Sequence, residues 1–276
     1  LNLIDQKKTY DYLLKIKPDV VIIAAAKVGG IFANMSQKAN FLYENMMIQN
    51  NIIHSAYRVG VKKLILLGSS CIYPKFSKQP IKEKYLLTSS LEETNDAYAI
   101  AKISGVKMCE NYSKQYNLNY ISLMPTNLYG PGDNYNSKYS HFFPALIKKV
   151  HLAVKNNKKE ITLWGNGKPK RELMYVDDLA NACEFFVKKN CKQSIINIGT
   201  GKEKKVIDYA KFILKKLNYK LKIKFDKNKP NGTPRKLLDS SLARSYGWKP
   251  KFDLDKGFKL TYKNFIEKEN KNNYLK

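Results

Sequence analysis

Lys63-Leu-Ile-Leu-Leu67 is aliphatic at every position after its lysine, and the turn residues Gly68-Ser-Ser70 follow it directly. An apolar run of this length is typical of a strand that is buried on both faces of a parallel sheet. Similar strand patterns recur, separated by amphipathic helical patterns: strands at 19–25 and 119–124, helices at about 4–17, 37–60 and 96–117. This alternation predicts an α/β fold, a doubly wound parallel sheet of the Rossmann type with helices on both faces.

The second half of the chain has longer loops and a different mixture of short elements. From about residue 132 we expect strands at 161–164, 194–198 and 222–225, and helices at 142–155, 177–189, 205–217 and 255–268. Residues 1–131 should form the Rossmann-type domain, and residues 132–276 a smaller α/β domain that closes over a substrate. Segments at about 175–200 are expected to return to the first domain. The last ten residues are rich in Lys and Asn and are expected to be frayed.

The formal net charge of +27 raises the question of nucleic-acid binding, because clustered cations neutralise phosphates. Only four of the 50 basic residues are arginine, and the lysines are scattered along the whole chain. Arginine is the preferred reader of phosphate and base edges, whereas lysine is mostly a solvated surface charge. The composition therefore predicts no nucleic-acid partner, although its field would attract an anionic substrate.

Cysteine usage and hydropathy bear on the compartment. The cysteines at 71, 109, 183 and 191 form no C-x-x-C pair and have no zinc-site spacing with the three histidines. No apolar run approaches 18 residues, and the first five residues lack the pattern of a signal peptide. We therefore expect a reduced, metal-free protein in the cytoplasm, with no membrane span.

Tyr98-Ala-Ile-Ala-Lys102 places a phenol and an ammonium on one face of a predicted helix, since residues four apart are neighbours there. The ammonium is expected to lower the pKa of Tyr98 from about 10 towards neutral pH. Ser69 and Cys71 lie just past the end of a buried strand, where a hydroxyl could hold a carbonyl oxygen against the phenol. This constellation indicates a keto-sugar reductase with a second, thiol-based activity.

Longer segments carry a resemblance to a known family. In chain order they are Ala24-Ala-Ala-Lys-Val-Gly-Gly-Ile31, Asn45-Met-Met-Ile48, Leu67-Gly-Ser-Ser-Cys-Ile-Tyr-Pro-Lys75, Ala97-Tyr-Ala-Ile-Ala-Lys102, Met124-Pro-Thr-Asn-Leu-Tyr-Gly-Pro131, Trp164-Gly-Asn-Gly-Lys-Pro-Lys-Arg-Glu172, Tyr175-Val-Asp-Asp-Leu-Ala180, Asn197-Ile-Gly-Thr-Gly201 and Gly232-Thr-Pro-Arg-Lys-Leu-Leu-Asp239. With these segments the chain resembles the GDP-L-fucose synthase family of extended short-chain dehydrogenases/reductases. The resemblance implies a bifunctional 3,5-epimerase/4-reductase that acts on GDP-4-keto-6-deoxy-mannose with NADPH.

The resemblance implies roles in the reduction. Tyr98 would give a proton to the C4 oxygen as NADPH delivers hydride to C4. Lys102 would lower the pKa of Tyr98 and hold the nicotinamide ribose, and Ser69 would hydrogen-bond the keto oxygen. Such chemistry is general-acid catalysis by a tuned phenol.

Cys71 and His141 would form the epimerisation pair. A C–H bond next to a ketone is acidic because the enolate spreads its charge onto oxygen. A thiolate on one face could take this proton while a protonated histidine on the other face returns one. Positive charge near Cys71 would help, since a free cysteine has a pKa of about 8.5. His54 and His151 lie on predicted helices and are expected to be structural.

The same resemblance implies two sets of binding residues. The cofactor would contact Lys102 together with Ala24, Ala25, Pro125, Asn127 and Leu128, and the GDP-sugar would face Lys149, Trp164, Arg171, Asn231 and Lys236. Arg171 could bind the diphosphate through a forked pair of hydrogen bonds. Asp177 is expected to cap a helix rather than to catalyse. The resemblance also implies a homodimer, formed through the helices near 37–60 and 96–117.

Three features depart from the family pattern. The chain begins at a segment that would follow the family's second strand, so the first strand and its Gly-x-x-Gly-x-x-Gly turn, which approaches the cofactor pyrophosphate, are expected to be missing. We therefore expect this polypeptide to bind NADPH poorly and to fold poorly. Lys149 stands where the family usually has arginine, and Asn231 replaces an aspartate that contacts the sugar nucleotide.

These departures leave alternatives open. One is an epimerase/reductase for another GDP-4-keto-sugar, such as a deoxy-heptose, although a pure reductase would need neither Cys71 nor His141. A second is an inactive truncated remnant, and a third is a basic binding module without enzymatic activity.

Overall fold

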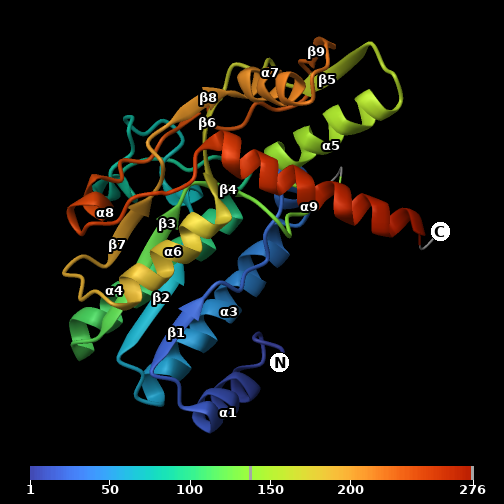
Figure 1. Cartoon of the computed structure of the whole chain (residues 1–276). Coiled ribbons are helices and arrows are strands. Elements are labelled where there is room, and N and C mark those ends of the chain that lie inside the picture. Colours follow the sequence, from blue (N-terminus) through green and yellow to red (C-terminus); the bar gives the residue numbers. More distant parts are fainter. Residues whose placement is uncertain (137–138, 275–276) are drawn as a thin grey trace.

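The structure, a computed structural model, describes residues 1–136 and 139–274. Its first sheet has four parallel strands in the order β1-β2-β3-β7, formed by Val20–Ile23, Lys63–Leu67, Asn119–Pro125 and Ile195–Ile198 (Figure 1). Because β7 pairs with β3, the chain returns to this sheet late in the sequence. Among the described residues β1 pairs with β2 alone, so it forms an edge of the sheet, where Ile22 is 46% exposed.

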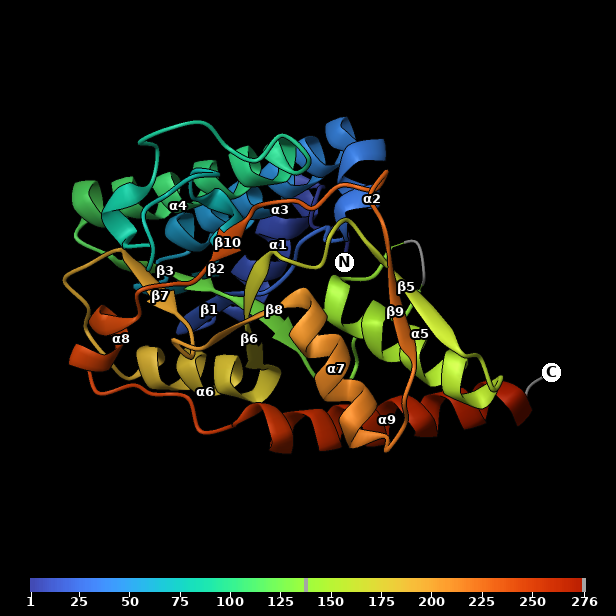
Figure 2. The same cartoon turned by 90° about the horizontal axis from the view of Figure 1, so that it is seen from above.

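Alternating side chains of β2 build a core on each face of this sheet. Leu64 and Leu66 pack into a cluster with α1 (Gln6–Ile16), α3 (Lys38–Arg58) and α4 (Asp96–Tyr116). Ile65 points the other way and packs against α6 (Val176–Val187). Figure 2 shows α1, α3 and α4 on one side of the strands and α6 on the other. The predicted doubly wound α/β fold is confirmed, since apolar positions on both faces require a helical layer on each.

The second half of the chain builds its own apolar core. Helices α5 (Phe142–Lys155), α7 (Val206–Lys216) and α9 (Leu254–Tyr274) pack around a parallel pair of strands, β5 (Glu160–Trp164) and β9 (Lys222–Asp226). Helix α9 continues beyond the predicted end at residue 268, as far as Tyr274, and the fraying expected of the last ten residues stays a prediction.

Several short elements escaped prediction because two to six residues carry too little periodicity. They are α2 (Ile31–Ser36), the 3-10 helices η1 (Ser70–Ile72) and η2 (Glu83–Tyr85), β4 (Asn127–Tyr129), β6 (Lys170–Tyr175), β8 (Glu203–Lys205), β10 (Arg235–Lys236) and α8 (Ser241–Ser245). A second sheet of order β10-β6-β4, with β8 also paired to β6, joins four of them. This sheet carries residues from four distant parts of the chain. Within β6, Leu173 and Tyr175 pack into the core of the second half, and Met174 packs into the core that contains α6.

The start of α6 corrects the role predicted for Asp177. The N-cap position is Tyr175, and Asp177 lies inside the first turn, where its charge favours the positive end of the helix dipole. Its neighbour Asp178 is the residue with a structural task, because its carboxylate accepts hydrogen bonds from the backbone N–H groups of Lys251 and Phe252 at 2.7 and 3.1 Å. In the described chain no helix is long and apolar enough to cross a membrane.

The side chain of Glu172, on β6, is fully buried and ties three segments together. Its carboxylate accepts hydrogen bonds from the backbone N–H of Gly201 at 2.7 Å, from that of Leu238 at 3.0 Å and from the Thr200 hydroxyl at 3.2 Å. Burial raises the pKa of Glu172, while these donors oppose the shift. The carboxylate therefore links β6 to the loop after β7 and to the segment after β10.

Replacing Glu172 by alanine is expected to lower the free energy of unfolding by about 2–4 kcal/mol, because the backbone N–H groups of Leu238 and Gly201 lose their acceptor, in a buried and a part-buried bond respectively. Urea denaturation followed by circular dichroism measures the change. Glu184→Ala is the control, since the Glu184–Lys188 ion pair is exposed to solvent and its loss should leave the free energy of unfolding nearly unchanged. Equal stability of the Glu172 variant and the control would contradict this role.

Candidate active site

One large cavity gathers residues from both halves of the chain. Its volume is about 1140 Å³, and it opens beyond the carboxyl ends of β1, β2 and β3. Parallel α/β sheets bind ligands at this edge. All the candidate site residues of the sequence analysis line the cavity except Ala25, although Ala24 and Ala26 on either side do so. The volume exceeds the roughly 300–1,000 Å³ typical of pockets for a single small ligand.

The loop after β2 and the helix α4 bring Ser69, Tyr98 and Lys102 together. Ser69 follows the strand by two residues, and its hydroxyl lies near enough to the Tyr98 phenol to lower the pKa of that phenol. The Lys102 ammonium lies one helical turn after Tyr98, is 3% exposed, and donates to the carbonyl oxygen of Leu67 at 2.9 Å. In the described residues no carboxylate lies at ion-pair distance from this ammonium, which leaves it available to a polar ligand.

The electrostatics of this pair correct one expectation. Burial raises the pKa of Tyr98, the nearby Cys71 adds to the shift, and the hydrogen bond with Ser69 opposes it. Burial also lowers the pKa of Lys102, to about 8. The predicted lowering of the Tyr98 pKa by Lys102 is therefore wrong for the ligand-free protein, because desolvation disfavours both charged forms. Tyr98 is a phenol at neutral pH, the state that a proton donor needs.

Cys71 lies in η1, a single 3-10 turn whose first backbone N–H groups are capped by Ser69. The Ser69 hydroxyl accepts from the Cys71 N–H at 3.1 Å, and the Lys236 ammonium donates to the Cys71 sulfur at 3.2 Å. Burial would raise the pKa of Cys71, but the charge and hydrogen bond of Lys236, the Ser69 hydroxyl and the charge of Arg171 together lower it. The positive charge that would help a Cys71 thiolate is thus present, as Lys236 and Arg171.

The other three cysteines differ from Cys71 in this respect. Burial raises the pKa of Cys109 to about 12 and that of Cys183 to about 11. Burial also raises the pKa of Cys191, although Lys63 opposes the shift. Among the four thiols of this chain, the one in the cavity is thus the most readily ionised.

His141 occupies the N-cap position of α5 and its imidazole opens into the cavity. Protein around the cavity removes part of its hydration, which lowers the pKa of His141, and the charge of Lys236 adds to the shift. The expected protonated form is therefore not favoured in the ligand-free protein. An anion bound between the imidazole and Lys236 would reverse this charge effect.

His54 and His151 lie away from the cavity lining. The His54 ring nitrogen shares a hydrogen bond of 2.7 Å with the Tyr112 hydroxyl, and His151 shares one of 2.9 Å with the Tyr262 hydroxyl. Both rings also pack edge-on against aromatic neighbours, as expected for structural residues.

The segment that carries His141 is fixed by a close approach of two backbones. The Gly30 N–H donates to the carbonyl oxygen of Tyr139 at 3.0 Å, and a Cβ at Gly30 would overlap the carbonyl oxygen of Ser140. A glycine is therefore required where the loop after β1 meets the residues just before His141.

Replacing Gly30 by alanine is expected to displace His141 and to lower the rate of any proton transfer by His141 about 100-fold. A displacement of a reacting group by about 1 Å can lower a rate by this factor. Reactions carried by Tyr98 should change far less, because Tyr98 lies on α4 and not on the segment that Gly30 contacts. Comparing deuterium uptake at carbons next to the ketone with the rate of ketone reduction separates the two effects. Equal losses in both reactions would contradict the prediction.

Basic side chains from the second half of the chain line part of the cavity. Arg171 donates to the carbonyl oxygens of Lys170 and Asn231 at 2.8 and 3.3 Å, and Lys149 donates to that of Thr162 at 2.6 Å. Within the described part of the chain, neither Arg171 nor Lys149 has a carboxylate at ion-pair distance. Cations without an internal counter-ion fit an anionic ligand such as a diphosphate.

The same part of the cavity has a flat apolar surface. Trp164 is 44% exposed and lies beside the cavity, with the Lys229 ammonium 5.7 Å from the centre of its ring. Asn231 holds the neighbouring turn, because its side-chain oxygen accepts from the Asn166 N–H at 2.9 Å. The arrangement suits a flat ring attached to an anionic group.

The described residues contain no group of three His, Cys, Asp or Glu side chains that could hold a metal ion. Sequence reasoning also missed residues that support the site without lining it, namely Gln79 and Glu172. Gln79 had no distinguishing pattern. Glu172 had one signal, an acidic residue directly before the apolar run Leu173-Met-Tyr-Val176.

A parallel sheet with a reactive Tyr, Lys and Ser at its carboxyl edge defines a class of protein. A family profile described as the NAD dependent epimerase/dehydratase family matches residues 1–199, and the chain belongs to this family. Within it, the chain belongs with the GDP-L-fucose synthases. It is 47% identical over 266 residues to GDP-L-fucose synthase of Sinorhizobium fredii, with 96% of this chain and 85% of the relative covered.

Two further comparisons, one with a relative and one with a solved structure, agree with this family assignment. The chain is 49% identical over 262 residues to GDP-L-fucose synthase 1 of Arabidopsis thaliana, with 95% of this chain and 81% of the relative covered. Among solved structures it resembles MlghC, a GDP-mannoheptose C4 reductase from Campylobacter jejuni with NADP bound. The TM-score is 0.86 at 34% identity, and 96% of this chain and 87% of that chain are covered.

Proposed function

We propose that this protein epimerises GDP-4-keto-6-deoxy-D-mannose at C3 and C5 and then reduces C4 with NADPH to give GDP-L-fucose. The observation that carries the proposal is a single cavity lined by both Ser69-Tyr98-Lys102 and Cys71-His141, with basic side chains for a diphosphate. The names of the most similar relatives support the same substrate.

The epimerisation rests on the two proton-transfer groups of the cavity. The Cys71 thiolate removes the proton from the carbon next to the C4 ketone; an S–H bond forms, and the electron pair of the C–H bond moves onto the ketone oxygen as an enolate. The His141 imidazolium then gives a proton to the opposite face of that carbon, which inverts it. The proton on Cys71 then leaves to solvent, and the neutral His141 imidazole takes up a proton from solvent. These two transfers restore the thiolate and the imidazolium for the second carbon.

The donor set fits a nicotinamide cofactor, because Lys102 offers a buried ammonium with no described counter-ion beside the small residues Ala24 and Gly68. Lys102, Pro125, Asn127 and Leu128 would hold its nicotinamide end. When bound, NADPH supplies a hydride to C4. Ser69 orients the keto oxygen, and the Tyr98 phenol gives that oxygen a proton, so that the alkoxide never has to exist free in the cavity.

The GDP-sugar would lie along the basic side chains of the cavity. Arg171 and Lys236 would bind the diphosphate, Lys149 would add a third positive charge, and Trp164 and Asn231 would contact the rest of the nucleotide or sugar. Lys149 presents a single point charge rather than a guanidinium fork, so it would bind phosphate with less geometric specificity than an arginine.

The test is incubation of the protein with GDP-4-keto-6-deoxy-D-mannose and NADPH, followed by absorbance at 340 nm and by NMR of the product. GDP-L-fucose, with deuterium at C3 and C5 when the reaction runs in D₂O, is the expected result. Turnover of a GDP-4-keto-heptose in place of this substrate would favour the alternative suggested by the name of the MlghC structure.

We also propose that the protein acts as a homodimer in the cytoplasm. The four free cysteines support a reducing compartment. For the dimer, α3 and α4 lie side by side and expose Tyr43, Ile100 and Tyr116, which are 59%, 47% and 39% exposed. Light scattering of the purified protein tests the assembly, and a monomer at micromolar concentration would contradict it.

A further inference from the structure

Lys236 is an unusual partner for a cysteine. Its ammonium lies 3.2 Å from the Cys71 sulfur, 165 residues away in the sequence. The Lys236 residue is only 8% exposed, so little water reaches its charge. Within residues 1–136 and 139–274 no carboxylate lies at ion-pair distance from it. A poorly hydrated cation favours an anionic neighbour, and the sulfur is the atom placed to provide that charge.

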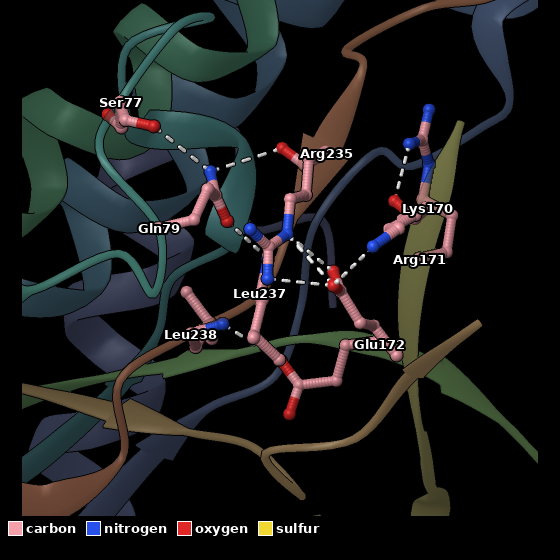
Figure 3. Close-up of polar contacts among 9 residues, drawn as sticks. Ser77, Gln79, Lys170, Arg171, Glu172, Arg235, Leu237 and Leu238 are labelled. Atoms are coloured by element: carbon pink, nitrogen blue, oxygen red, sulfur yellow. Dashed lines mark hydrogen bonds and ion pairs between the residues drawn. The ribbon is translucent and has the colours of Figure 1, made fainter. Parts of the chain in front are cut away.

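The backbone around Lys236 is held from the side of the loop after η1. Figure 3 shows that the Gln79 amide spans this two-residue strand. Its Nε2 donates to the carbonyl oxygen of Arg235 at 3.2 Å, and its Oε1 accepts from the N–H of Leu237 at 2.9 Å. The two contacts flank Lys236 in the chain, so Gln79 fixes the position of its Cα.

The opposite side of the strand is held as firmly. Lys236 is in parallel register with Arg171 on β6. The Arg235 guanidinium binds the Glu203 carboxylate with contacts of 2.8, 3.0 and 2.8 Å, and Leu238 is held by the Glu172 carboxylate. The Lys236 ammonium is therefore preorganised beside the Cys71 sulfur, so no rearrangement is needed to bring the two together when a ligand binds.

The sulfur is positioned just as well. Ser70 and Ile72, on either side of Cys71, are 4% and 0% exposed, and Ser69 caps the backbone N–H of Cys71. The 3-10 turn is thus anchored by buried neighbours while its central side chain points into the cavity.

Other charged and titratable groups face the same sulfur or its lysine. Arg171 on β6 acts on Cys71 as a second, more distant cation, and the Tyr98 phenol faces it from α4. His141 at the start of α5 senses the charge of Lys236, and Glu92, in the loop before α4, acts on Arg171. Of these groups Lys236 alone has a hydrogen bond to the sulfur among the described residues.

We propose that Lys236 holds Cys71 as a thiolate and so prepares it as the base of the epimerisation, in addition to any contact with the substrate diphosphate. Lys236 is a positioning residue in this role, because it acts on the reaction through the sulfur. The catalytic consequence rests on the proposed function, whereas the ionisation of the thiol does not.

The first test is alkylation of the protein by iodoacetamide between pH 5 and 10, without substrate or cofactor, followed by mass spectrometry of the peptide that contains Cys71. In Lys236→Met the midpoint of the pH profile should rise by about one unit, and the rate at pH 7 should fall about tenfold. Lys236→Arg should restore most of the shift, because it returns the charge. The Cys191 peptide is the internal control and should keep its profile in all variants.

An unchanged Cys71 midpoint in Lys236→Met would overturn the proposal, and so would a Lys236→Arg profile no different from that of the methionine variant. If Lys236→Met does not fold, thiolate absorbance at 240 nm in the unmodified protein, with Cys71→Ser as the reference, gives the pKa of Cys71 directly. A value at or above about 8.5, that of a free cysteine, would be equally decisive against it.

The second test separates this proposal from the proposed function. Deuterium uptake from D₂O at C3 and C5 of GDP-4-keto-6-deoxy-mannose, measured without NADPH, should fall about tenfold at pH 7 in Lys236→Met, and part of the loss should be recovered at pH 9. Loss that is identical at both pH values would assign Lys236 to substrate binding alone. Absence of uptake in the unmodified protein would refute the epimerase function and leave the alkylation result to decide the thiolate.

Discussion

Replacing Tyr98 by phenylalanine is expected to lower kcat for the C4 reduction by about 100- to 10,000-fold, the usual contribution of a general acid. The phenol lines the cavity together with Ser69, and burial keeps it protonated at neutral pH. Without it, the developing alkoxide at C4 has no proton donor in place. NADPH oxidation at saturating substrate measures the effect.

The matched control is Tyr112→Phe, which removes another phenol on the same helix, one that bonds to His54 outside the cavity. This variant should keep kcat within about a factor of two. Deuterium uptake at C3 and C5 should persist in Tyr98→Phe, because proton transfer at those carbons does not use the phenol. A Tyr98→Phe protein that reduces the ketone at the unmodified rate would rule Tyr98 out as the acid.

Replacing Cys71 by serine is expected to reduce deuterium uptake at C3 and C5 by about 100- to 10,000-fold. A serine hydroxyl beside Lys236 remains neutral near pH 7, whereas the lowered pKa of Cys71 makes the thiolate available. Reduction at C4 should continue and yield a GDP-6-deoxy sugar without inversion at C3 and C5. NMR of the product therefore reports both outcomes in one sample.

Cys191→Ser serves as the control for this substitution. Cys191 is also a partly exposed free cysteine, but it lies outside the cavity lining and burial raises its pKa. Its variant should exchange deuterium at the unmodified rate. Retention of exchange in Cys71→Ser would remove the thiol from the mechanism.

The parts of the fold that the sequence predicted are those with enough residues to show a period. Aliphatic runs such as 63–67 bury both faces of a strand, so they predicted the parallel sheet and the helical layers that cover it. The same pattern placed Ser69 just past the end of a buried strand, and the structure has it in the cavity at that edge of the sheet. The resemblance to a family supplied the remaining side chains of the cavity.

What the sequence could not predict depends on contacts between distant segments. The strand Arg235–Lys236 has two residues and no period, yet it carries the ammonium that reaches Cys71. The sign of the Tyr98 shift was wrong because spacing along a helix reveals a nearby charge but not the loss of water around it. Gln79 acts through its amide on backbone groups, a task that leaves no mark in the order of residues.

Both reaction centres line one cavity, although Cys71 comes from a turn after β2 and Tyr98 from α4. Nothing in this geometry forces inversion to precede hydride transfer. The stereochemical purity of the product therefore depends on two competing rates, that of epimerisation of the keto sugar and that of its reduction at C4. Once C4 is reduced, the neighbouring carbons can no longer be inverted. A high ratio of reduced to oxidised nicotinamide would speed the reduction, so the redox state of the cell would act on the stereochemistry of the sugar as well as on its rate of formation.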